Sequence, residues 1–231
     1  MEIFNRQNKI IDLVEANYHL LPVINRFGVD LGNKDKSLGK ICEEKGINID
    51  FFLVIINTFH NKAYFPETEF RSFSPLLIID YLRKTHAHYL EYVLPKLEFL
   101  LRQLIQSNKT DIHQLDIIEQ FYLKYKAELL LHIKEEEEKV FPYIAGLVNN
   151  ELDRIDYSIH SFEKEHTNVD IKLNDLKSLI IKYLEPVYDN NICNEFLITL
   201  FRFEKDISDH ARIEDMILIP QVVELEKNIN G

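Results

Sequence analysis

The chain has 231 residues, a net charge of −11 at pH 7 and an isoelectric point near 5.3. This acidic balance argues against a nucleic-acid-binding surface, which needs clustered Lys and Arg, and against an anionic membrane partner. Hydrophobic residues make up 46% of the chain, enough for a sizeable core, while six glycines and seven prolines are few for an all-β protein.

The beginning of the chain predicts several short helices. One apolar stripe runs from Ile10 to Val14 and another from Leu20 to Phe27. Ser37 is a candidate N-cap for a third helix that ends at Gly46, and Asp50 is a candidate N-cap for a fourth. These elements predict a small helical N-terminal domain.

The next stretch has a different character. Residues 61–74 mix aromatic side chains, a proline and charges without any period, which predicts a linker. We therefore divide the chain into an N-terminal domain, 1–60, a linker, 61–74, and a C-terminal domain, 75–231. The N-terminus lacks the apolar stretch of a signal peptide, and the longest apolar run, 51–56, is far shorter than a membrane span. Cytoplasm is the expected location, and Cys42 and Cys193 are expected to be buried free thiols.

Long helices are predicted after Pro75. Apolar residues alternate at spacings of three and four, which is the pattern of a bundle helix. The predicted helices cover 75–106, 112–148, 151–184 and 190–226, with short breaks between them. Short breaks make neighbouring helices antiparallel, so the sequence predicts an all-α, up-down-up-down four-helix bundle.

Two of these helices carry the same polar motif. His132 and Glu136 in the second helix, and His210 and Glu214 in the fourth, form HxxxE pairs with a proline ten residues after each His. Residues at i and i+4 share a helix face, so each pair can bind one metal site. A single HxxxE is usually a solvated pair, but both pairs lie on apolar seams. Because burying such groups without partners is costly, coordination of a metal is the better explanation.

Helical phase also selects histidines in the other two helices. His86 lies on the seam of the first helix, and His88 lies on a more polar face. His166 lies on the seam of the third helix, and His160 does not. Counted from the breaks, the selected residues fall at one height of an antiparallel bundle. The predicted metal ligands are therefore His86, His132, Glu136, His166, His210 and Glu214.

The paired HxxxE motifs, with single histidines in the first and third helices, resemble the hemerythrin-like domain. The fuller resemblance is to the repair of iron centres proteins, which carry a small helical domain before the bundle. Val23–Asn57, with Phe27-Gly-Val-Asp30 inside it, resembles that domain. The resemblance implies two non-haem iron ions, joined by an oxo or hydroxo bridge, with the histidines as terminal ligands and Glu136 and Glu214 as bridges.

The chain departs from those families at two places. The N-terminal domain of the repair proteins usually has a Cys-Cys pair after its acidic residue, whereas Leu31-Gly32-Asn33 follows Asp30 here. Oxygen-carrying hemerythrins have another histidine one turn after the ligand of the third helix, and Asp170 takes that position here. The second departure argues against simple reversible oxygen storage. Glu165, in contrast, matches an acidic position near the family's site.

Two functions follow from the resemblance. The first is a redox-active di-iron protein that binds or reacts with NO, O₂ or peroxide, or that supports repair of Fe–S clusters in Fe–S proteins under stress. The second is a sensing module in which the iron site reports O₂, NO or iron to a protein partner through the N-terminal helices. The same nitrogen and oxygen ligands also accept manganese or zinc. A purely structural bundle does not explain six polar ligands at one level. The sequence fixes neither the oligomeric state nor the physiological ligand.

Overall fold

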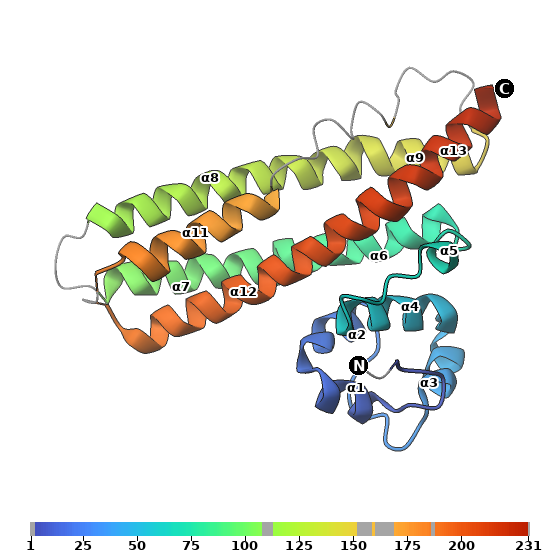
Figure 1. Ribbon diagram of the computed structural model, residues 1–231, viewed down its shortest axis with the longest axis horizontal. Coiled ribbons are helices and arrows are strands. Elements are labelled where there is room, and N and C mark those ends of the chain that lie inside the picture. Colours follow the sequence, from blue (N-terminus) through green and yellow to red (C-terminus); the bar gives the residue numbers. More distant parts are fainter. Residues whose placement is uncertain (1–2, 108–112, 152–158, 160–168, 186–187, 231) are drawn as a thin grey trace.

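In the computed structural model, the protein is described over residues 3–107, 113–151, 159, 169–185 and 188–230. Within these ranges the named elements are all helices, and no strand occurs. A long bundle and a group of short helices beneath one end of it make up the molecule (Figure 1). The fold class is therefore all-α, as predicted.

The short helices form the N-terminal part of the chain. Their bounds are α1 Ile10–Ala16, η1 Tyr18–Leu20, α2 Leu21–Arg26, α3 Leu38–Lys45 and α4 Ile49–His60. The α3 helix begins and ends as expected, because the Ser37 side chain accepts a hydrogen bond from Lys40 N–H and Gly46 adopts a left-handed φ of 67°. The predicted cap of α4 is wrong: Asn48, not Asp50, accepts the first backbone N–H groups.

The segment predicted to be a linker contains a short helix, α5 Glu67–Phe70. Phe70 is completely buried, and its ring lies 5.2 Å from that of Phe65. The segment is held against the bundle, because Gln221 donates hydrogen bonds to the carbonyls of Arg71 and Phe73. Aromatic residues without a helical period therefore pack here as an irregular cover.

The bundle helices agree with the predicted spans where the structure describes them. The first helix is α6 Pro75–His88, η2 Tyr89–Val93 and α7 Leu94–Gln106, and the second is α8 His113–Glu135, η3 Glu136–Val140 and α9 Phe141–Val148. The third is described only as α11 Val169–Tyr183, and the fourth is α12 Asn190–Ile213, η4 Glu214–Leu218 and α13 Ile219–Asn230. Helix α12 packs on α7 and α11, and α8 packs on α11 (Figure 1).

In the described part of the bundle, the first, second and fourth helices each contain one turn of π-helix, which was not predicted from the sequence. In η2, η3 and η4 the wide turn is closed by i→i+5 hydrogen bonds to the carbonyls of Tyr89, Glu136 and Glu214. The second residue after each turn is a proline: Pro95, Pro142 or Pro220. A proline lacks the N–H and its ring collides with the carbonyl four residues earlier, so a wider turn lets the helix continue.

The hydrophobic core has two parts along the bundle. One cluster joins the N-terminal helices to residues 78–82, 140–147 and 213–222 of the bundle. The other contains residues 89–104, 115–133, 173–184 and 193–207 at the opposite end. The N-terminal part therefore shares a core with one half of the bundle.

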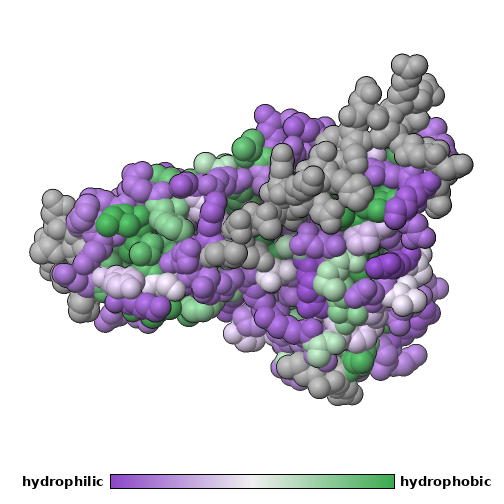
Figure 2. All heavy atoms as spheres, turned by 45° about the horizontal axis from the view of Figure 1, so that its top comes forward, coloured by the Kyte–Doolittle hydropathy of each residue, from purple (hydrophilic) through white to green (hydrophobic). Residues whose placement is uncertain are grey.

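The outer surface is mostly hydrophilic in the face shown by Figure 2. Hydrophobic side chains reach that surface toward the bundle end remote from the N-terminal helices (Figure 2). In the bundle, Ile117 and Leu123 of α8 are exposed. Across the described ranges, no helix combines the length and the apolar character that a membrane crossing requires.

Candidate metal centre

The candidate site lies where the two hydrophobic clusters meet. His86 comes from the end of α6, Glu136 begins η3, and His210 and Glu214 come from α12 and the start of η4. Each position lies on the buried face of its helix: the exposed fractions are 2%, 1%, 4% and 2% in that order. The apolar seam thus carries these polar side chains into the interior at one level.

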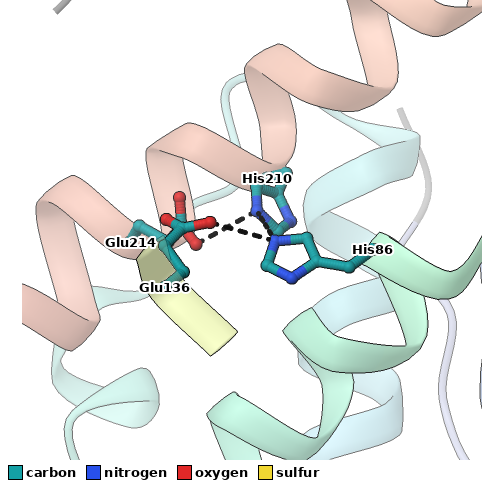
Figure 3. Close-up of side chains that lie close together, drawn as sticks. All are labelled: His86, Glu136, His210 and Glu214. Carbon is teal, nitrogen blue, oxygen red and sulfur yellow. Dashed lines mark hydrogen bonds and ion pairs between the residues drawn. The ribbon is translucent and has the colours of Figure 1, made fainter. Parts of the chain in front are cut away.

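Four ligand atoms converge in this layer. One nitrogen or oxygen from each of His86, Glu136, His210 and Glu214 lies within 4.8 Å of the others (Figure 3). The two Nε2 atoms of His86 and His210 are 3.2 Å apart. Glu214 Oε1 is 3.0 Å from His210 Nε2 within its own helix. Three chain segments far apart in sequence therefore present a compact set of nitrogen and oxygen donors.

Glu136 lies between two histidines. Its Oε2 is 3.2 Å from His86 Nε2, and its Oε1 is 3.3 Å from His132 Nε2. His132 is at the edge of the site, with a side chain that is 20% exposed. The carboxylate of Glu136 therefore extends the cluster from His86 toward His132 through its two oxygens.

A second carboxylate orients His86. Glu137 Oε1 is 2.8 Å from His86 Nδ1, and Arg83 Nε donates a hydrogen bond of 3.0 Å to Glu137 Oε2. Because the carboxylate accepts the Nδ1 proton, Nε2 is left facing the cluster as the ligand atom. This role of Glu137 was not predicted from the sequence, where Glu137 is one of four consecutive acidic residues, 135–138. The available signal was Arg83, one turn before His86.

The carboxylates also change the proton affinity of His86. Burial lowers the pKa of the imidazole, but hydrogen bonds to Glu136 and Glu137, together with nearby Glu214, outweigh burial and raise that pKa to about 9. For Glu137, burial raises the pKa, and the contacts with His86 and Arg83 bring it below its usual value. The carboxylates therefore make this layer electrostatically negative, and a bound cation would neutralise that negative charge.

The donor set fits a metal ion. Two carboxylates that are almost fully buried would be costly without positive charge beside them. His210 Nδ1 is buried and has no hydrogen-bond partner in the part of the chain that the structure describes. Imidazole and carboxylate together suit iron, manganese or zinc, so these residues can hold such an ion.

The remaining predicted residues have different outcomes. His166 and Glu165 lie outside the described residues, as does the side chain of Asp170. His88 is outside the cluster: its ring stacks on Tyr92 at 5.4 Å and lines a pocket beside the N-terminal helices. Helical phase thus separated His86 from His88 in the way that the structure places them.

Comparison with known proteins places this site in a family. No curated protein sequence matches the chain. The hemerythrin HHE cation-binding domain matches residues 77–222, which include His86, Glu136, His210 and Glu214 and cover more than half of the chain. The chain therefore belongs to the hemerythrin HHE cation-binding family.

Proposed function

We propose that the chain is a non-haem di-iron protein that binds or reacts with NO, O₂ or peroxide. The observation that carries the proposal is the buried layer of two imidazoles and two carboxylates contributed by three bundle helices. In this proposal the ligands are His86, His132, Glu136, His166, His210 and Glu214.

Glu136 and Glu214 would hold the two ions as shared, bridging ligands. The contacts of Glu136 support this role, because its oxygens approach His86 and His132 separately, at 3.2 and 3.3 Å. Two metal ions, one beside each imidazole, would share such a carboxylate. Glu214 is the corresponding residue of the fourth helix and lies beside His210.

The surrounding residues restrict what reaches the site. The Phe141 ring stacks on His86 at 5.6 Å, and the Tyr89 ring lies 5.8 Å from His210. Both aromatic rings are almost fully buried and exclude water from the layer. Bound iron supplies redox chemistry and open coordination positions for a small ligand. Support of Fe–S cluster repair is part of the proposed function, because the chain resembles the repair of iron centres proteins.

A sensing function is the second candidate. The N-terminal helices contact the bundle near the site, because Arg26 of α2 donates hydrogen bonds to Asp206, one turn before His210. A change at the metal layer would therefore be felt at a contact with the N-terminal part. A protein partner that recognised these helices would then respond to the state of the iron.

The test is metal analysis and optical spectroscopy of the full chain purified without oxygen, before and after separate additions of O₂, NO and peroxide. We expect about two irons per chain and an absorption change with at least one of these ligands. A single tightly held zinc after iron-replete expression would overturn the di-iron proposal. Bound iron whose spectrum responds to neither gas nor peroxide would overturn the reactivity and leave metal binding in place.

The bridging role has a matched pair of variants. Glu136→Gln should reduce iron from about two per chain to less than one, because an amide is neutral and a poor bridge between two cations. Glu138→Gln is the control, since that carboxylate is 63% exposed and lies near Lys134, away from the cluster. Equal iron content in the two variants would refute the bridging role. Glu137 cannot serve as a control, because it contacts His86.

A further inference from the structure

A pocket lies between the N-terminal helices and the bundle, apart from the metal layer. Its volume is 200 Å³. One wall comes from η1, the start of α2 and Phe59. The other comes from His88, η2 and the start of α7 in the first bundle helix, and from α12 around Arg202. Leu21, Phe59, Val93 and Phe203 give it an apolar interior.

Positive side chains surround this pocket although the whole chain carries −11. Lys96, Arg202 and Lys205 line it, and Asp206, the one carboxylate among the described residues that line it, accepts hydrogen bonds from Arg26. Among the described residues, no carboxylate forms an ion pair with Arg202 or Lys96, although both side chains line the pocket. The Arg202 guanidinium lies over the Tyr18 ring at 5.4 Å. Because the ring contacts the flat face of the guanidinium, the N–H groups in its plane stay available to donate hydrogen bonds to a ligand.

The neighbouring acidic groups do not cancel this charge. Glu204, which lines the adjoining open groove together with Lys62, forms an ion pair with Lys177. Lys205 donates to the Phe59 carbonyl at 3.0 Å and approaches Asp209 at 3.4 Å, so it is partly satisfied. Arg202 and Lys96 therefore remain as the cations that a ligand can use.

The imidazole of His19 lies in the wall of this pocket and is affected by the same positive charges. Burial lowers the pKa of His19, and the charges of Arg202 and Lys205 lower it further.

We propose that this pocket binds a small organic carboxylate with an apolar body. The apolar walls accept the body, and the guanidinium of Arg202 can bind a carboxylate through two parallel hydrogen bonds, with Lys96 adding charge. Pockets for drug-sized ligands measure about 300–1,000 Å³, so the ligand here is smaller. A phosphate dianion fits less well, because it requires more donors than these apolar walls offer.

The experiment is titration calorimetry of the full chain with benzoate and hexanoate as probes. Benzamide, the neutral analogue of benzoate, tests the need for charge, and phenyl phosphate tests the choice of anion. We expect saturable binding of at least one carboxylate, at least about tenfold weaker binding of benzamide, and weaker carboxylate binding at high salt. Equal affinities for benzoate and benzamide, tighter binding of phenyl phosphate, or no binding of either carboxylate would each overturn the proposal.

Variants locate the binding at this pocket. Arg202→Gln and Lys96→Gln should each weaken carboxylate binding, the former by about tenfold. Arg102→Gln is the control with the same change of charge, because Arg102 is 66% exposed and pairs with Glu98 on α7. Unchanged affinity in both pocket variants, or an equal loss in the control, would refute the site. The measurement is independent of the iron chemistry, since iron content is expected to be unchanged in all three variants.

Discussion

A buried ion pair fastens the N-terminal helices to the bundle, and its removal should be costly. Arg26 of α2 donates from Nη1 to Asp206 Oδ1 at 2.9 Å, from Nη2 to the other oxygen, and to Tyr81 Oη at 3.3 Å. The side chain of Arg26 is 2% exposed and that of Asp206 is 17% exposed. The arginine is therefore almost completely withdrawn from water.

The expected magnitude follows from this burial. Removing one partner of a buried pair costs about 3–5 kcal/mol, because the remaining charge loses its partner without regaining water. Asp206 keeps some contact with solvent, so Arg26→Ala should lower the free energy of unfolding by about 3 kcal/mol, the low end of that range. The pair between Arg6 and Asp50, with exposed fractions of 57% and 63%, is the control. Arg6→Ala should cost at most about 1 kcal/mol.

Urea unfolding followed by circular dichroism measures both changes. A double-mutant cycle of Arg26→Ala with Asp206→Ala separates the pair from the packing that arginine also provides. We expect the double variant to lose less free energy of unfolding than the two single variants lose together, by more than about 1 kcal/mol. If Arg26→Ala cost no more than Arg6→Ala, or if the two pair variants were additive, the pair would not hold the two parts together.

Two further predictions concern the site and the thiols. His86→Ala should remove at least about one of two irons per chain, whereas His88→Ala should retain both, because of these two only His86 lies in the buried layer. Metal analysis measures the iron content of the two variants, and equal contents would refute this prediction. Neither Cys42 nor Cys193 should react with a thiol reagent at pH 7 in the native protein, because both are buried and burial raises the pKa of Cys42 to about 11 and that of Cys193 in the same direction. Two thiols per chain should titrate in denaturant, and fast labelling of the native protein would contradict the burial.

The bundle was predictable because burial follows helical periodicity. In the first helix Leu82, His86, Tyr89 and Val93 follow one another at the spacings of three and four that define the seam, and all four are buried. The seam of the fourth helix, from Phe196 through Glu214 to Ile217, is buried as well. Since the polar residues occupied apolar positions of a regular pattern, the same periodicity that predicted the fold also predicted which histidine faces the interior.

Other features depend on contacts that periodicity does not encode. Glu137 orients His86, which belongs to another helix, so this role cannot be read from the sequence around Glu137. The residues on either side of Glu137 are also acidic, and one of them, Glu138, is exposed. The cap of α4 depended on a choice between two polar residues two positions apart, Asn48 and Asp50. The π-helical turns let a helix continue past a proline. In other proteins a proline often ends the helix instead, so the sequence pattern alone does not distinguish the two results.

The polar layer between the two hydrophobic clusters also affects how the molecule unfolds. Apolar contact makes each cluster a cooperative unit, but His86, Glu136, His210 and Glu214 interrupt that contact across the middle of the bundle. A cation bound by all four would join the halves into one unit that unfolds in a single transition. Without it, the half remote from the N-terminal helices is free to open first, and amide hydrogen exchange would reveal this as faster exchange in α7 and the start of α12 than in α6 and α13.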